Sequence, residues 1–366
     1  MTPRASNAFV RIGSGKSPAV ILFLWSALAM IACATPETRV KAPTMDHAVV
    51  IASVPVTPSC QKAVARQSSR AGFALVIQAA DILAPDIISG LDELYRKIHA
   101  IRGVLSIQSI TDEQVLVPGD LGVSAEPFMP PEGLDRGGRL ARVGRFAGLI
   151  DPALLSPDLR VSALIVKLLP TSKANARAEI RKRLLELART SSAGLRATLS
   201  EYPVAARESL TWKTETSLAA LKIIDDSLRG GGVIEIGADC GRDDCLLDPG
   251  NVLSIDSIEK SIRSLPRVRA SWSFVHVLRF ANRASGRTSL PESADAALQL
   301  LAVMDTSSGI DLHTDKKFRR ATVRVHFTTG NAADYCGLGK ALKKAALLAT
   351  SQALRFYVKK PGREGF

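Results

Sequence analysis

Two segments of the chain share one pattern of apolar and polar positions. Residues 83–104 read LAPDIISGLDELYRKIHAIRGV, and residues 247–268 read LDPGNVLSIDSIEKSIRSLPRV. They align without a gap at an offset of 164 residues, which sets Pro85 on Pro249. The matched apolar positions recur at three- and four-residue steps, as on the buried face of an amphipathic helix. Because each copy begins near a proline and ends before a β-branched run, we predict the same helix twice, in a duplicated domain.

Short apolar or alternating runs surround the first copy and predict strands. The predicted strands of this half are 72–79, 104–110, 160–170 and 195–203, and the predicted helices are 85–101 and 173–190. Residues 111–157 are rich in Gly and Pro and form an insertion with a short helical piece. The predicted order is therefore β-α-β, insertion, β-α-β.

The second half repeats this order. Its predicted strands are 232–238, 268–278, 319–329 and 353–358, and its predicted helices are the second copy, 290–305 inside an insertion, and 334–350. A helix over 204–228 would join the halves, closed by glycines that act as C-cap and hinge. The predicted fold class is α+β, with two tandem ferredoxin-like lobes in which an antiparallel sheet packs two helices on one face.

The N-terminus is predicted to be a targeting segment. A basic region precedes the apolar run AVILFLWSALAMIA, which is shorter than a membrane span and ends in Met30-Ile31-Ala32-Cys33. This ending resembles a bacterial lipobox, which implies cleavage before Cys33 and its lipidation; an ordinary secretory signal is the alternative. Several acyl chains anchor a protein stably. Ala34, in place of the Asp that commonly retains lipoproteins at the inner membrane, favours the outer membrane.

These patterns divide the chain into six parts. They are a lipoprotein signal peptide (1–32), a proline-containing tether (33–59) with a strand candidate at 47–54, the first lobe (60–203), the connecting helix and glycine hinge (204–231), the second lobe (232–358) and a C-terminal tail (359–366). The expected location is the bacterial cell envelope, facing the periplasm and lipid-anchored.

Composition changes this picture little. A chain of 366 residues with 46% hydrophobic residues can bury two cores. The net charge of +13 comes from clusters on predicted helices and in the first insertion. The clustered residues are Arg136, Arg139, Arg142 and Arg145; Arg177, Arg181, Lys182, Arg183 and Arg189; and Lys340, Lys343 and Lys344. Solvated helix faces are the favoured interpretation, and attraction to anionic lipid headgroups or an acidic partner is the alternative. Nucleic acid is disfavoured because aromatics are only 5%.

Four cysteines follow Cys33, as suits an oxidising compartment. Cys240 and Cys245 flank Gly-Arg-Asp-Asp, a turn that a local disulfide could close. Cys60 and Cys336 are the remaining pair, which the sequence alone leaves undecided. A metal site is disfavoured because no second pair of ligands accompanies them.

Catalysis finds no support in the sequence. There is no Gly-x-Ser-x-Gly elbow, no His-Glu-x-x-His and no glycine-rich loop after a strand, so no catalytic residue and no cofactor is expected. The five histidines are far apart, and we interpret each as a surface or packed side chain: His47, His99, His276, His313 and His326. Asp92 and Asp256 are equivalent carboxylates of the repeat, for which fold maintenance is a sufficient explanation.

The ordered series of segments resembles a known family. APDIISGLDELYRKIHAIRGVLSIQSI and LLSPDLRVSALIVKL in the first half, and LLDPGNVLSIDSIEKSIRSLPRV, LPES and KKFRRATVRVHFTTG in the second, are similar to the periplasmic porter domains of resistance-nodulation-division exporters, especially the MmpL-type and hydrophobe-exporter branch. The resemblance covers roughly residues 60–358 and implies a role in handling cargo. The family's membrane-helix bundle, which holds its proton-relay carboxylates, has no counterpart after residue 33.

Three classes of function follow from this reading. The first, which is the prediction that the porter resemblance favours, is a non-enzymatic lipoprotein that binds or hands off a lipid or other hydrophobic cargo in an apolar cleft between the lobes, as accessory to an inner-membrane exporter. The second is a structural or adaptor lipoprotein that docks envelope proteins without cargo, which a filled, polar lobe interface would favour. The third, an unrecognised enzyme, would need a convergent acid–base cluster in a pocket.

Overall fold

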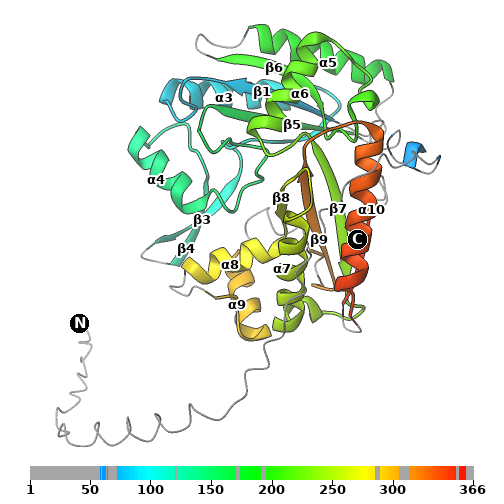
Figure 1. The fold of residues 1–366 in the computed structure, drawn as a ribbon. Helices are drawn as coiled ribbons and strands as arrows, with labels where there is room; N and C mark the ends of the chain where they lie inside the picture. The colour runs from blue at the N-terminus through cyan, green and yellow to red at the C-terminus, as the bar shows by residue number, and fades with distance from the viewer. Residues whose placement is uncertain are drawn as a thin grey trace, which may run out of the picture. The chain divides into compact units, whose positions relative to one another are not determined.

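The computed structural model describes residues 58, 60–62, 64, 72–119, 122–169, 174–190, 195–284, 289–304, 314–315, 317–351 and 354–359. All of them belong to one compact unit, residues 51–366. Within it the fold is mixed α+β with antiparallel sheets (Figure 1). The predicted signal peptide, Cys33 and the strand candidate at 47–54 lie outside the described residues.

The first half contains a four-stranded antiparallel sheet in the order β2-β5-β1-β6. Its strands are β1 (Gly72–Gln78), β2 (Val104–Gln108), β5 (Val161–Leu168) and β6 (Arg196–Tyr202). The helices α3 (Pro85–His99) and α5 (Ala174–Arg189) come between these strands in the chain and pack against the sheet and each other. Pro85 occupies the first turn of α3, as its repeated position predicts.

The central strand β1 is buried over nearly its whole length, because side chains cover both faces of the sheet. Phe73 of β1 faces helix α5, because the Arg177 guanidinium of α5 lies 5.9 Å from the centre of its ring. Phe73, Leu75 and Ile77 therefore face the helices, since alternate residues of a strand share a face.

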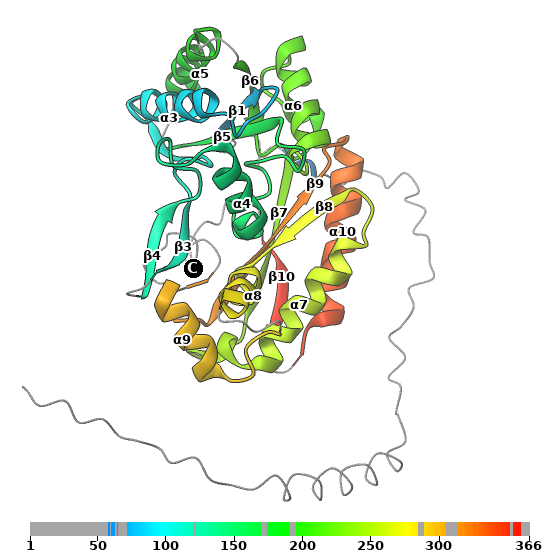
Figure 2. The same cartoon turned by 90° about the vertical axis from the view of Figure 1, so that its left-hand side faces the viewer.

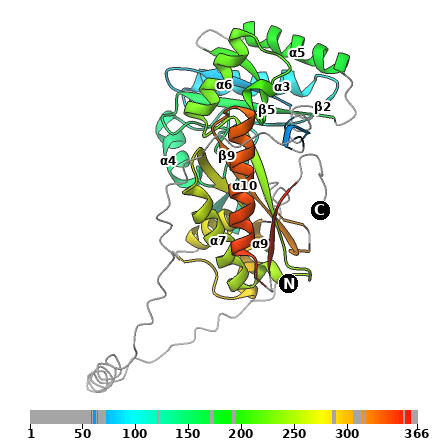
Figure 3. The same ribbon diagram turned by 45° about the vertical axis from the view of Figure 1, so that its right-hand side comes forward.

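The second half contains another four-stranded antiparallel sheet, in the order β10-β7-β9-β8. Its strands are β7 (Gly232–Asp239), β8 (Val268–Trp272), β9 (Arg320–Phe327) and β10 (Arg355–Val358). The helices α7 (Pro249–Arg263) and α10 (Ala332–Ala349) pack side by side (Figure 3). A capping box between Asn331 and Asp334 fixes the start of α10.

Two predicted elements are wrong in part. The predicted strand 268–278 ends at Trp272, and α8 (Phe274–Ala284) follows. The Ser273 hydroxyl accepts a hydrogen bond from the Val275 N–H at this junction, and the buried residues beyond it recur at helical spacing. The connecting helix, α6 (Glu215–Ser227), begins eleven residues later than predicted, after the short 3₁₀ turn η1 (Arg207–Ser209). Thr214 caps it through a reciprocal pair of bonds with Ser217.

The insertions hold more structure than the sequence predicted. In the first, the hairpin of β3 (Gln114–Gly119) and β4 (Gly122–Pro127) was missed, and α4 (Arg136–Phe146) is the expected helical piece (Figure 2). In the second, α9 (Ala294–Met304) is the predicted helix, shortened at its start. A 3₁₀ turn, η2 (Cys245–Leu247), precedes α7.

The glycines after α6 are required for close packing. Gly230 has φ +110°, a conformation that other residues rarely adopt, and a Cβ there would overlap the Phe327 carbonyl. A Cβ on Gly232 would overlap the ring of Phe327, which is buried. The buried Asp225 carboxylate also accepts bonds from the N–H groups of Gly231 and Thr329, at 2.8 and 2.9 Å. These contacts hold the end of α6 against β9.

We expect Gly232→Ala to lower the free energy of unfolding by about 1–3 kcal/mol, because the added methyl group overpacks a buried ring. Chemical denaturation with circular dichroism measures this. Gly144→Ala is the matched control: Gly144 lies within α4 with no atom near its virtual Cβ, so this change should be neutral or stabilising. Equal stability of both variants would contradict the packing role of Gly232.

Candidate functional site

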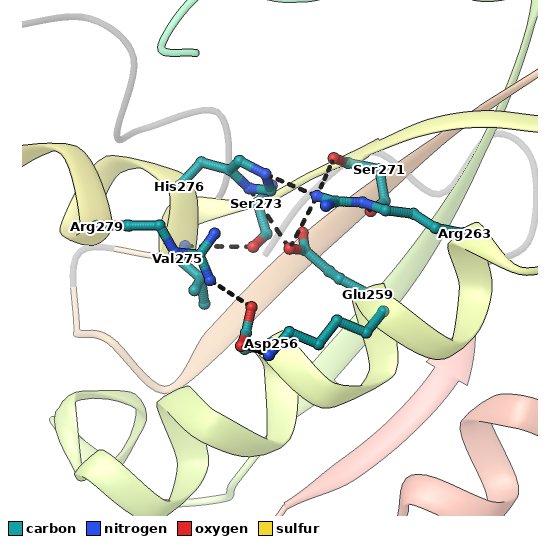
Figure 4. A network of polar contacts seen from close by, with 9 residues as sticks. Asp256, Glu259, Arg263, Ser271, Ser273, Val275, His276 and Arg279 are labelled. Atoms are coloured by element: carbon teal, nitrogen blue, oxygen red, sulfur yellow. Dashed lines mark hydrogen bonds and ion pairs between the residues drawn. The ribbon is translucent and has the colours of Figure 1, made fainter. Parts of the chain in front are cut away.

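The second copy of the repeated helix carries a polar network that we call the α7–α8 network (Figure 4). Helix α7 contributes Asp256, Glu259, Lys260 and Arg263, whose spacing brings them to one side of the helix. The end of β8 and the start of α8 supply the rest, namely Ser271, Ser273, His276 and Arg279. Four of the eight are basic or histidine side chains, and the two acidic ones are buried.

Asp256 joins the two helices. Its carboxylate oxygens lie 2.5 Å from Arg279 Nη2 and 2.8 Å from Lys260 Nζ. Burial by itself would raise the pKa of Asp256, but the hydrogen bonds from Lys260 and Arg279 outweigh it and lower the pKa. Asp256 is therefore an ionised carboxylate that holds α8 against α7.

Glu259 lies deeper, with only 1% of its side chain exposed. Its Oε2 is 3.4 Å from His276 Nδ1 and 3.8 Å from Arg263 Nη2. Burial raises the pKa of Glu259 to about 7, against the lowering effects of the Ser273 hydroxyl and the Arg263 charge. The cation distances are too long to restore the normal pKa of a carboxyl group.

His276 lies between Arg263 and Glu259. Its Nε2 is 2.8 Å from Arg263 Nη2, and since the guanidinium can only donate, Nε2 accepts. Its Nδ1 lies 3.4 Å from Glu259 Oε2 and also 3.4 Å from the Ser273 backbone nitrogen, whose N–H points at it. Burial, together with the charges of Arg263 and Arg279, lowers the pKa of His276 to about 4. At neutral pH the network thus holds an uncharged imidazole beside a carboxyl group that titrates.

The described residues of the first half form no equivalent network. Asp92, which aligns with Asp256, pairs with Arg96 at 2.6 Å on the surface of α3. Tyr95 and His99 take the places of Glu259 and Arg263, and their rings stack with centres 6.1 Å apart. The aspartate is shared by the repeat, whereas the buried Glu259 belongs to the second half alone.

A second polar cluster lies where the two halves meet, and we call it the inter-sheet contact. It is formed by Asp151, from the segment before β5, with Arg324 and His326 of β9. Phe327 of β9 contacts the ring of Tyr335 on α10, with ring centres 5.9 Å apart. Phe327 therefore faces the helices of the second half. Arg324 and His326 occupy the alternate positions of β9, so they face away from those helices and toward the first half.

Asp151 bridges this contact. Its Oδ2 is 3.4 Å from Arg324 Nη1, and its Oδ1 is 3.6 Å from His326 Nε2. Asp151 is 5% exposed and His326 fully buried. Arg324 also pairs with Glu235 of β7 at 3.5 Å. The described contact between the two halves thus includes charged side chains, and Val233 of β7 also packs against the core of the first half.

The surroundings favour uncharged partners at this contact. Burial lowers the pKa of His326, which keeps its ring neutral. Burial and the nearby Asp151 raise the pKa of Glu113 to about 7. Burial also raises the pKa of Tyr202 on β6. Asp151 and Arg324 are thus a charged pair beside the uncharged side chains of His326 and Tyr202.

The cysteines of the structure are paired as the sequence suggested. One disulfide joins Cys240 to Cys245, with Cα atoms 6.3 Å apart, and closes the turn between β7 and η2. The other joins Cys60 to Cys336 of α10, with Cα atoms 6.0 Å apart. The second bond ties the start of the first lobe's segment to the second half, which sequence reasoning had left undecided.

No group of three or more His, Cys, Asp or Glu side chains within the described ranges is arranged to hold a metal ion. The histidines that the structure describes, His99, His276 and His326, lie in three different environments. Within the same ranges, no helix is long and apolar enough to cross a membrane. The two clusters are chiefly means of holding elements together.

Comparison of the chain with models of known protein families gives no match, and comparison with curated proteins gives none.

Proposed function

We propose that this protein is a non-enzymatic lipoprotein of the bacterial envelope, built from two porter-like lobes of ferredoxin-like topology, that docks partner proteins. The two sheets support the tandem arrangement, because they have the same strand order. If the four strands of each half are numbered along the chain, both sheets have the order 2-3-1-4 from one edge to the other. That order is the one expected of a split β-α-β unit. The resemblance of the ordered segments to porter domains points to an exporter of the inner membrane, or another envelope protein, as the partner.

The observation that favours docking is the inter-sheet contact. A site for an apolar cargo needs an apolar lining with few polar groups. Asp151 and His326 instead meet between the halves as buried polar groups, beside Arg324, whose side chain is 15% exposed. Opening the halves to admit a lipid tail would separate a buried ion pair, which is costly. A joined pair of lobes is better suited to presenting a fixed outer surface.

Binding or hand-off of a lipid or other hydrophobic molecule is the second candidate. The shared strand order of the two sheets favours it, because it is the arrangement expected of a porter pair that handles cargo. Each methylene removed from water would contribute about 0.8 kcal/mol, so a partly buried acyl chain could hold a measurable complex.

Native mass spectrometry of the protein extracted from its own membranes separates these candidates. Docking predicts a complex with another protein and no bound lipid beyond the anchor. A titration with a fluorescent fatty acid should then show no saturable binding, while circular dichroism shows that the protein is folded. Stoichiometric lipid together with saturable probe binding would overturn docking in favour of cargo handling.

The lipid anchor has its own test. Cys33→Ser should move the protein from the membrane pellet to the soluble fraction, because the lipid attachment site is lost. Ala34→Ser leaves the attachment cysteine in place and should stay in the pellet. Fractionation with immunoblotting measures both, and separation of the two membranes tests the expected outer-membrane location. Equal membrane retention of Cys33→Ser and the parent protein would contradict anchoring at Cys33.

A further inference from the structure

Helix α10 lies on the outside of the second half (Figure 3). Its exposed side chains include lysines and leucines. Lys340, Lys343 and Lys344 are exposed, and Leu347 and Leu348 are 63% and 67% exposed. At 100° per residue, these five side chains fall within one broad stripe of the helix. The opposite face, formed by Tyr335, Leu338, Leu342 and Ala346, is buried.

This face has a single sign of charge. The sequence from residue 335 to residue 351 contains three lysines and neither Asp nor Glu. The one acidic residue of the helix, Asp334, is in its first turn, where it caps the helix and pairs with Arg267 at 3.0 Å. Helix α5 differs, because its Arg183 pairs with Glu179 at 3.3 Å. The leucines of α10 therefore adjoin a positive surface.

The disulfide ties the predicted tether to the same helix. Cys336 lies eleven residues before Leu347, three full turns along α10, so the two share one stripe. Cys336 is bonded to Cys60, which ends the segment that follows the predicted anchor at Cys33. A chain of that length reaches at most about 90–100 Å. Cys336 is itself buried, and its bond to Cys60 marks the N-terminal end of the stripe that carries the lysines and leucines.

We propose that this lysine–leucine face of α10 contacts an anionic lipid bilayer and sets how the anchored protein lies on its membrane. The inference rests on the proposed lipid anchor. Helices that lie in the headgroup region of a bilayer combine lysines with exposed leucines. Their apolar side chains insert into the bilayer, and their charged groups lie near the phosphates. Each basic side chain near an anionic surface strengthens partition about fivefold. An anchored body needs only such modest gains, since the tether keeps the local concentration high.

The test is a lysine footprint of the full, lipid-bearing protein. The protein is reconstituted into vesicles of phosphatidylcholine alone or mixed with phosphatidylglycerol, and acetylation of each lysine is followed by mass spectrometry. We expect Lys340, Lys343 and Lys344 to react at least about threefold more slowly on the anionic vesicles. Lys97 of α3 and Lys182 of α5, which are exposed elsewhere, should react equally on both. Raising salt to about 0.5 M, where the screening length is about 4 Å, should remove the difference.

Leucine variants supply the matched control. Leu347→Ser with Leu348→Ser should lessen the protection of the lysines, because the face loses the side chains that insert. Leu218→Ser with Leu298→Ser removes two leucines of α6 and α9 that are 43% and 47% exposed, and should leave the protection unchanged. Equal protection in both pairs would overturn the inference.

Vesicle flotation separates this inference from the anchor. A protein that floats but shows equal acetylation on both kinds of vesicle contradicts the α10 contact and leaves the anchor intact. If Cys33→Ser floats as well as the parent, the anchor fails, while the footprint still reports on α10. Protection seen in native membranes but absent on anionic vesicles would assign the face to an acidic protein instead of lipid.

Discussion

Arg324→Met should destabilise the protein by about 3–5 kcal/mol, the usual cost of leaving a buried charge without its partner. Arg324 lies 3.4 Å from Asp151, whose side chain is 5% exposed. The other neighbour of that carboxylate is His326, which burial keeps neutral. Within the described ranges Asp151 forms no ion pair with another Lys or Arg, so its carboxylate would have to protonate or reach water. Denaturant unfolding at pH 7 measures the loss.

Two comparisons sharpen this prediction. Adding Asp151→Asn to Arg324→Met should recover part of the lost stability, because the orphaned charge is removed. Arg183→Met breaks the exposed Arg183–Glu179 pair and should change stability by less than about 1 kcal/mol. A loss from Arg324→Met no larger than that from Arg183→Met would mean that the inter-sheet contact does not hold the halves together.

The second large effect is a change in pH dependence on Glu259→Gln. The pKa of Glu259 is about 7 in the folded protein and lies near the ordinary 4.5 when unfolded, so this group makes folding less favourable as pH rises from 4.5 to 7. His276 has the opposite effect, since its folded pKa of about 4 lies below the ordinary 6.5 and stability is lost as pH falls through that range. Each shift corresponds to about 3 kcal/mol, so the two largely cancel in the parent protein.

Replacing Glu259 by Gln removes one side of this balance. The variant should be more stable than the parent above pH 7, by as much as about 3 kcal/mol, and should lose that advantage as pH falls toward 4.5. The amide keeps the size of the side chain, while Arg263, Arg279 and Asp256 remain as neighbouring charges. The difference in unfolding free energy between variant and parent, measured from pH 4.5 to 8, isolates this group from others such as Glu113.

His276→Gln is the converse experiment. It leaves the raised pKa of Glu259 in place, so stability relative to the parent should improve as pH falls from 6.5 to 4. A difference from the parent that does not change with pH, in either variant, would show that the burial of Glu259 and His276 does not shift their titration.

The periodic elements of this protein could be predicted from sequence because local pattern encodes them. The apolar steps of 85–101 and 249–265 predicted α3 and α7, and Pro85 and Pro249 marked their first turns. Strands β1, β5 and β9 were predicted because β-branched runs suit buried strands. The prediction failed where a helix cap breaks an apolar run. The segment VRASWSFVHVL was predicted as one strand, but Ser273 caps α8 between the end of β8 and the start of that helix.

The polar clusters are different, because their members are far apart in the chain. The alternation of Arg324 and His326 with Val323 and Val325 is visible in the sequence and indicates that β9 has one polar face. That this face meets Asp151, in a loop of the first insertion, follows only from how the two sheets pack. Burial then sets the pKa values of Glu259, His276 and Glu113, since each depends on water removed by elements distant in sequence.

The sequence by itself determined the repeated helix, the order of the main elements and the turn between Cys240 and Cys245, because neighbouring residues specify each of them. The tertiary structure alone decided that Cys60 pairs with Cys336 and that Asp151 meets Arg324. Those outcomes depend on bringing together segments whose separation in the chain leaves no local signal.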